Sequence, residues 1–296
     1  DDAQARYVET EYTSYLTVAR QFSRVGGRLA RKCFAEHPLP DLHNAELKYS
    51  ENPVLTIILP VGGEDRLRNF QCVLASLINQ SLSEIEIIVL EHSEKPVYIA
   101  VLPKGVRYLH VEMTGPEEEF NKSMLLNKGV ELSRAPMVLL HDADILVPVD
   151  YLRQSAKRIE MGYDAVRPLR FLFYLDEHVT AQVVSNRAMP EQNLIDSVAQ
   201  NSQGGSTLIR KNVYLEIGGH DERFEGWGGE DLEFLERLST RKLFKGGFMP
   251  AAHLWHPAAQ KKASGDKNQR ILSSLRTIEP MERIDRLRAV DTGTEE

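Results

Sequence analysis

The chain of 296 residues has few cysteines, no excess of positive charge and no long apolar run. Two cysteines, Cys33 and Cys72, are too few for a disulfide framework and are typical of a reducing compartment. A net charge of -7 argues against a general nucleic-acid binder, which is normally basic. No segment approaches the roughly 20 apolar residues that cross a bilayer, and the first residues have no signal-peptide pattern.

These absences predict a cytoplasmic protein. Contact with the inner face of a membrane is compatible with the sequence, although no transmembrane segment indicates it. Because the chain opens with Asp1-Asp2 instead of methionine, this expectation leaves room for a targeting segment before residue 1. The length predicts one large globular domain, or one domain with an appendage.

Residues 1–52 are polar and carry an imperfect helical stripe of apolar side chains. We interpret them as an N-terminal helical extension that ends near Pro38 and Pro40. The basic residues of this region are Arg20, Arg24, Arg28, Arg31 and Lys32. They are compatible with contact to anionic lipid or to a partner, but charge runs more often mark a solvated helix face.

Apolar strands and amphipathic helices alternate after residue 52, and we expect the main domain to cover 53–262. The predicted strands are 54–59, 85–90, 106–111 and 137–140, and the predicted helices between them are 66–80 and 121–134. Continuous apolar runs such as 54–59 are typical of strands buried on both faces. The alternation predicts an α/β fold with a Rossmann-like, mostly parallel central sheet flanked by helices.

The later half of the chain is less regular. Its predicted elements are strand over 165–185, a strand at 207–209, a helix over 230–241 and a C-terminal helical segment, 263–296, in which a helix over 266–290 is broken at Pro280. Proline cannot continue a helix, since it lacks the amide donor and clashes with the preceding turn.

Polar residues follow the predicted strands, where ligands of parallel sheets bind. Pro60 and Val61 follow the first strand, Glu91 the second, and Asp142 and Asp144 the fourth. Two carboxylates one residue apart can share a divalent cation with a nucleotide diphosphate, although such a pair also occurs in ordinary turns. Glu91 is suited either to a hydrogen bond with a ribose or uracil, or to a surface turn.

His253 and His256 are the second pair of metal-ligand candidates. Neutral imidazole suits borderline metals such as manganese. A spacing of three puts both rings on one side only if the chain is helical or bent, and Pro257 favours a bend. The alternative is a pair of structural histidines.

Asn121 and Lys122 open the predicted helix over 121–134. Asn121 is a suitable N-cap, and Lys122 lies at the positive helix end where phosphate binds. A capped, solvated helix start is the alternative interpretation.

The string Gly226-Trp227-Gly228-Gly229-Glu230-Asp231 is the most informative stretch of the sequence. Glycines allow close approach to a ligand, and an indole can stack on a sugar face. The two carboxylates open a predicted helix, where its dipole favours negative charge. An acidic helix start with no catalytic role is the alternative.

Taken in order, these motifs resemble those of GT-A glycosyltransferases. The strand closed by Pro60, the stretch 75–93 and Asp142-Ala143-Asp144 resemble family 2 enzymes. Residues 120–129, residues 204–238 and the histidine pair resemble the β-1,4-galactosyltransferase type, bacterial chondroitin synthases and polypeptide N-acetylgalactosaminyltransferases. The resemblance covers roughly 54–260 and implies a GT-A fold.

The resemblance also implies roles for individual residues. Asp144, His253 and His256 would bind Mn²⁺, with Mg²⁺ as the alternative ion, and Asp231 would be the general base beside Glu230, an acceptor contact. The implied donor and nucleotide contacts are Pro60, Val61, Glu91, Asn121, Lys122, Asp142, Trp227 and Gly228. Two departures are visible, because Glu91-His92 replaces the family's usual Asp-Asp and Gly62-Gly63 follows the first strand.

The resemblance therefore implies an inverting, metal-dependent transferase that moves a hexose or N-acetylhexosamine from a UDP-sugar to a carbohydrate, glycoconjugate or other hydroxyl acceptor. One alternative is a nucleotidyltransferase, which would not need the tryptophan and acidic loop. Another is a non-catalytic sugar-binding or scaffold domain within a polysaccharide synthase complex.

Overall fold

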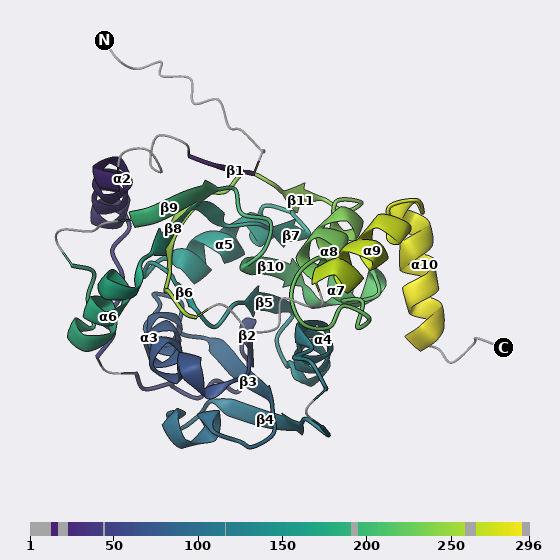
Figure 1. The fold of residues 1–296 in the computed structure, drawn as a ribbon, viewed down its shortest axis with the longest axis horizontal. Helices are drawn as coiled ribbons and strands as arrows, with labels where there is room; N and C mark the ends of the chain where they lie inside the picture. The colour runs from purple at the N-terminus through teal and green to yellow at the C-terminus, as the bar shows by residue number, and fades with distance from the viewer. Residues whose placement is uncertain are drawn as a thin grey trace, which may run out of the picture.

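The computed structural model describes residues 13–16, 23–43, 45–115, 117–190, 195–257 and 265–291. They form two sheets with helices packed around them (Figure 1). None of the described helices has the length and apolarity needed to cross a membrane. Cys33 and Cys72 are both free thiols.

The larger sheet has seven strands in the order β11-β7-β10-β5-β2-β3-β4. Their bounds are Leu55–Val61 (β2), Ile85–Ser93 (β3), Arg107–Glu112 (β4), Met137–His141 (β5), Ala165–Val166 (β7), Ser206–Arg210 (β10) and Leu243–Phe244 (β11). Strands β4, β3, β2 and β5 are parallel, and β10 runs antiparallel to β5. The predicted mostly parallel sheet is confirmed, and β2 continues through Pro60 and Val61.

Both faces of this sheet are covered. All seven residues of β2 are buried. Ile57 and Leu59 point into one apolar cluster and Ile58 into another, because alternate side chains of a strand face opposite sides. In Figure 1, α3 lies on one side of the sheet and α4, α7 and α8 lie on the other. The mostly apolar composition of β2, in which Thr56 is the one polar residue, follows from this double burial.

The second sheet has the order β1-β9-β8-β12-β6. Its strands are Ser14–Tyr15 (β1), Ile145–Leu146 (β6), Leu169–Leu175 (β8), Ile195–Gln200 (β9) and Met249–His253 (β12). The short strand β1 pairs with β9, so part of the N-terminal extension belongs to this sheet. The sheet lies against the carboxyl end of β5 through β6, which follows β5 after a short turn.

The helices are α2 (Ser23–Glu36), α3 (Leu67–Ile78), α4 (Lys122–Leu132), α5 (Tyr151–Glu160), α6 (Glu177–Asn186), α7 (Lys211–Glu216), α8 (Glu230–Leu238), α9 (Gly265–Leu275) and α10 (Pro280–Asp291), with 3₁₀ turns η1 (Glu64–Arg66) and η2 (Tyr98–Val101). The predicted helices that flank the parallel strands are confirmed. The break at Pro280 is also confirmed, since α10 begins with this proline, whose missing amide donor costs nothing at a first helical position.

Two predictions are wrong. The extension is not helical throughout, because within it the structure describes one helix, α2, the strand β1, and an irregular segment after residue 36; residues 1–12, 17–22 and 44, and with them Arg20, lie outside the described residues. The strand predicted over 165–185 ends at Leu175. Asp176 then caps α6 by accepting a hydrogen bond from the Val179 amide at 2.7 Å, which starts a helix instead.

Candidate active site

The two histidines meet Asp144 because of how β6 pairs with β12. The antiparallel pairing places His253 opposite Ile145, the residue after Asp144. The Leu254 amide then donates to the Asp144 carbonyl at 2.8 Å, which holds the chain at this point as it leaves the strand. His256 thereby approaches the same carboxylate, and the bend needed for two histidines three residues apart to share one site is present.

Asp144, His253 and His256 form a compact set of metal-type ligands. His256 Nε2 lies 3.2 Å from Asp144 Oδ2, and His253 Nε2 lies 3.6 Å from Asp144 Oδ1. One ligand atom from each residue lies within 4.8 Å of the others. The carboxylate is buried, and Oδ1 accepts no hydrogen bond from the described part of the chain. One carboxylate, two imidazoles and an unsatisfied buried oxygen fit a divalent ion such as Mn²⁺.

Positive charge collects around Asp144 in addition to the histidines. Arg66, from the turn η1 after β2, places Nη1 3.2 Å from Asp144 Oδ2. Burial alone would raise the pKa of the Asp144 carboxyl, but His253, His256 and Arg66 outweigh it and hold this pKa well below its usual range. The hydrogen bond to Asp144 raises the pKa of His256. The site is therefore built to keep one carboxylate ionised.

Lys122 joins Asp142, the first residue after β5, to the acidic pair of α8. Its Nζ lies 2.9 Å from Asp142 Oδ1, 3.1 Å from Asp231 Oδ1 and 3.7 Å from Glu230 Oε1. Burial would lower the pKa of Lys122, but these carboxylates raise it well above its usual value. Asn121 caps the helix as predicted, accepting from the Met124 amide at 2.9 Å. The predicted phosphate contact of Lys122 stays a prediction, since its ammonium is here bound by carboxylates.

Glu230 and Asp231 begin α8 and are both shifted toward the protonated form. Burial, with the neighbouring Asp231, raises the pKa of Glu230 to about 7. Burial also raises the pKa of Asp231, while Lys122 opposes this rise. Gly204 leaves room for the Asp231 carboxylate, because an added Cβ at Gly204 would overlap it. A carboxylate with a raised pKa in a partly buried setting is suited to accept a proton near neutral pH.

The loop before α8 presents Trp227 to solvent. Its side chain is 67% exposed. Gly226, Gly228 and Gly229 have φ values of 71°, 97° and 94°, in the region that glycine tolerates. The Gly226 amide donates to the Phe120 carbonyl at 2.9 Å, which ties the loop to the start of α4. An exposed indole on such a loop is suited to stack on a sugar ring.

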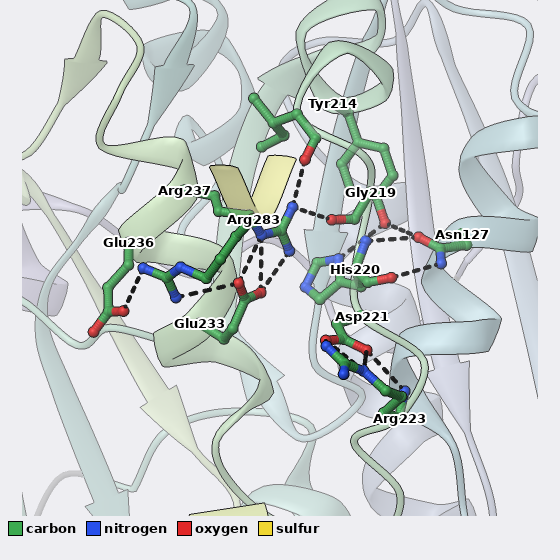
Figure 2. A network of polar contacts seen from close by, with 11 residues as sticks. Asn127, Tyr214, Gly219, His220, Asp221, Arg223, Glu233, Glu236, Arg237 and Arg283 are labelled. Atoms are coloured by element: carbon green, nitrogen blue, oxygen red, sulfur yellow. Dashed lines mark hydrogen bonds and ion pairs between the residues drawn. The ribbon is translucent and has the colours of Figure 1, made fainter. Parts of the chain in front are cut away.

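A buried polar network holds α8 in place (Figure 2). Arg237 is completely buried and pairs with Glu233 at 2.6 Å, while its Nη1 donates to the carbonyls of Ile217 and Gly219. Arg283 of α10 reaches the same Glu233 at 3.3 Å. Breaking such a pair would leave a buried charge without compensation, so the network is costly to disrupt. Because it ties α8 to the turn at Ile217–Gly219 and to α10, it holds the helix that begins with Glu230 and Asp231 in place.

Of the remaining predicted nucleotide contacts, Pro60, Val61 and Glu91 lie near the carboxyl ends of β2 and β3. Pro60 and Val61 are buried at the end of β2. Glu91 is fully buried and accepts hydrogen bonds from the Tyr108 hydroxyl at 2.6 Å and from the Tyr98 amide at 3.0 Å, among others. Its burial inside β3 does not fit the surface turn of the alternative interpretation, and its predicted contact with the nucleotide stays a prediction. Gly228 lies in the open loop beside Trp227, and its role stays a prediction.

Several contributors to the site were not identified from the sequence. Arg66 follows the first strand by a few residues, and a charged residue at that strand end is a signal that was available. Gly204 carries no such signal, because its need for glycine comes from a neighbour brought in by the fold. Asn268 of α9 likewise carries no sequence signal, because its partners are backbone carbonyls that the fold brings close to it.

Residues 56–254 match the sequence model of the family described as glycosyltransferase like family 2. This match covers more than half of the chain, and the protein belongs to that family. The structure agrees, since the matched residues form the mostly parallel sheet with flanking helices of a GT-A glycosyltransferase.

The curated relatives act on chondroitin according to their names. Chondroitin sulfate N-acetylgalactosaminyltransferase 2 from Mus musculus is 30% identical over 155 residues, covering 47% of this chain and 27% of the relative. The protein of the same name from Homo sapiens is 31% identical over 154 residues with the same coverage. Chondroitin sulfate synthase 3 from Mus musculus is 23% identical over 256 residues, covering 82% of this chain and 26% of the relative. The chain thus spans about a quarter of the length of these relatives.

Among solved structures, the mannosyltransferase PcManGT from Pyrobaculum calidifontis, in complex with GDP-Man and Mn²⁺, superposes with a TM-score of 0.49 and 14% identity. The match covers 91% of this chain and 74% of that one.

Proposed function

We propose that this family 2 protein is an inverting, metal-dependent glycosyltransferase that uses a UDP-sugar. The observation that carries the proposal is the bridge made by Lys122 between Asp142 and Asp231, at 2.9 and 3.1 Å. Asp142 precedes Asp144 by two residues, so this bridge supports a site in which a metal-type ligand set and a pair of base-type carboxylates act together. A transferase needs both, one for the departing diphosphate and one for the incoming hydroxyl.

In this proposal Asp231 accepts the proton of the acceptor hydroxyl while that oxygen attacks the anomeric carbon. The new bond forms as the bond from the anomeric carbon to the diphosphate oxygen breaks, and the electron pair leaves with UDP. Attack from the face opposite the leaving group inverts the configuration. Glu230 holds the acceptor, and Trp227 stacks on a sugar ring. A general base in this position typically contributes about 10²–10⁴-fold to the rate.

Asp144, His253 and His256 are the residues that would hold Mn²⁺ or Mg²⁺. The bound ion would supply charge stabilisation for the departing diphosphate. Asp142 lies beside this set and is held by Lys122.

The names of the relatives suggest the first substrates to test. We propose N-acetylgalactosamine as the transferred sugar, carried on UDP, and a chondroitin oligosaccharide as the acceptor. One or two pocket side chains that contact the sugar decide such a preference, so other UDP-hexoses and UDP-N-acetylhexosamines belong in the same panel.

The test incubates the purified chain with UDP-N-acetylgalactosamine, Mn²⁺ and chondroitin oligosaccharides, with and without EDTA. We expect release of UDP, an elongated oligosaccharide and loss of both in EDTA. Proton NMR of the new linkage is expected to show the β configuration, since the donor is α-linked.

Each alternative gives a different result in this assay. Transfer of the uridylyl group to the acceptor, with release of N-acetylgalactosamine 1-phosphate instead of UDP, would indicate a nucleotidyltransferase. Binding of the oligosaccharide without UDP release from any donor of the panel would indicate a non-catalytic sugar-binding domain. An α-linked product would contradict inversion.

A further inference from the structure

Helix α9 follows the family-matched segment 56–254 in the chain, yet it packs against α8 and contacts the loop that precedes α8. In Figure 1 it lies beside α8, at the end of the molecule opposite α2. Two neighbouring side chains of α9 make this contact: exposed Lys267 pairs with the Glu225 carboxylate at 2.6 Å, and Asn268, which is 1% exposed, binds the loop backbone.

Asn268 binds the backbone of the loop at two points. Its Nδ2 donates to the Glu225 carbonyl at 2.8 Å and to the Trp227 carbonyl at 3.2 Å. These carbonyls flank Gly226, whose amide donates in another direction, to Phe120 at the start of α4. The loop is thus held from α9 on one side and from α4 on the other.

Apolar contacts surround this anchor. Phe224, just before the loop, is 2% exposed and packs in one cluster with Leu272 and Leu275 of α9. An added Cβ at Gly229, just after Trp227 and Gly228, would lie 2.7 Å from the Phe224 ring. Both ends of the loop therefore rest on the same small cluster.

The loop needs such an external anchor. It contains three glycines, which lose more backbone entropy on ordering than other residues. Trp227 is 67% exposed, so most of its surface faces solvent. The hydrogen bond from Asn268 to the Trp227 backbone carbonyl holds the part of the loop from which the indole extends.

We propose that Asn268 is a positioning residue for the acceptor: by holding the Glu225 and Trp227 carbonyls, it presets the loop that presents Trp227 and leads into Glu230. This inference rests on the proposed function, in which Glu230, directly after the loop, holds the acceptor and Trp227 stacks on a sugar ring. The inference adds a residue of α9 to those that shape the proposed acceptor site.

Asn268→Asp tests the proposal with little change in size. The carboxylate cannot donate to either carbonyl and faces both with negative charge. With UDP-N-acetylgalactosamine and Mn²⁺ saturating, we expect the KM for chondroitin oligosaccharide to rise about tenfold or more, since two hydrogen bonds are lost. The affinity for UDP with Mn²⁺, measured by calorimetry, is expected to stay near that of the wild type, because the proposed metal ligands lie on other elements.

Gln269→Ala is the matched control. Gln269 is the next residue of α9 and is exposed, so its removal is expected to leave the acceptor KM unchanged. Should Asn268→Asp fail to fold, Asn268→Ser replaces it, and a hydroxyl that reaches one carbonyl predicts an intermediate KM.

A second readout does not depend on enzyme activity. The chain has two tryptophans, so in a Trp255→Phe background all indole fluorescence comes from Trp227. We expect Asn268→Asp in this background to lower the anisotropy of that fluorescence, while Gln269→Ala leaves it unchanged.

The outcomes separate this inference from the proposed function. If the wild-type chain transfers no sugar, the proposed function is contradicted. If Asn268→Asp still lowers the anisotropy of Trp227 fluorescence in that case, the anchoring of the loop by Asn268 is supported. An acceptor KM and an anisotropy both equal to wild type in Asn268→Asp overturn the inference. So does an equal loss of acceptor and UDP affinity, which would mark a general structural role.

Discussion

Removing the Lys122 cation is the perturbation whose size is best defined by the structure. The ammonium lies 3.1 Å from Asp231 Oδ1 and 2.9 Å from Asp142 Oδ1. Lys122→Met keeps the length and apolar stem of the side chain and removes the charge. Asp231, the proposed base, then faces Asp142 and Glu230 without a compensating cation, and its protonated form is favoured.

The size of the effect follows from Coulomb's law. Two unit charges about 4 Å apart attract by about 4 kcal/mol at an effective dielectric constant near 20. The Asp231 side chain is 33% exposed. Solvent therefore screens the attraction between Lys122 and Asp231, and we take about a third of the 4 kcal/mol as effective. This energy corresponds to about one pKa unit. The pKa of the acidic pair is expected to rise by at least that much.

The assay is the pH dependence of kcat at saturating donor and acceptor. In Lys122→Met the acid limb is expected to move up by about one pH unit, so that below the limb the rate falls about tenfold. Lys128→Met, an exposed lysine of the same helix, is the control and should leave the profile unchanged. An acid limb at the wild-type pH in Lys122→Met refutes this electrostatic role. Weaker UDP binding in the same variant would support the predicted phosphate contact.

Asp144→Ala should abolish the dependence of UDP binding on Mn²⁺ in calorimetry, and equal binding to wild type would place the ion elsewhere. Because the pKa of Glu230 is raised to about 7, its carboxylate is protonated as the pH falls through that value, and acceptor KM should rise; Glu230→Gln should remove this pH dependence, whereas its persistence would assign the titration to another group. Arg283→Ala should lower the free energy of unfolding in urea by about 3 kcal/mol because it breaks a buried pair, while exposed Arg286→Ala should change it by less than about 0.5 kcal/mol. Equal losses in these two variants would contradict the importance of the buried network.

The parallel half of the fold was predictable because its signals are local. β2 and β3 are short and mostly apolar, and both ends of α4 carry polar residues, with a cap at Asn121. Burial on both faces produces such runs, so the sequence pattern and the packing agree. The prediction of strand over 165–185 was wrong because apolar residues continue from the strand into the following helix. The Asp176 cap is the local signal that separates the two elements.

The second sheet and the meeting of the site residues were beyond local patterns. Strands β1 and β6 have two residues each, and their partners lie far away in the chain. The contact between Asp144 and His253 depends on that register, and the bridge made by Lys122 depends on the approach of α8 to α4. The resemblance to GT-A enzymes supplied these residues as candidates, while the structure supplies their distances. Contacts made by residues outside the family match, such as that of Asn268, could be predicted neither from local patterns nor from the resemblance.

The most direct test of the proposed mechanism compares Asp231→Asn with Glu230→Gln on one acceptor. Both changes keep the shape of the side chain and remove its charge. Asp231→Asn is expected to lower kcat by about a hundredfold or more with UDP affinity near wild type, because only the proton acceptor is lost. Glu230→Gln is expected to raise the acceptor KM as well as lower the rate. If Asp231→Asn keeps its turnover while Glu230→Gln is inactive, the two roles are exchanged; if both keep wild-type turnover, the acidic pair is structural and this chain is not an inverting transferase that uses them.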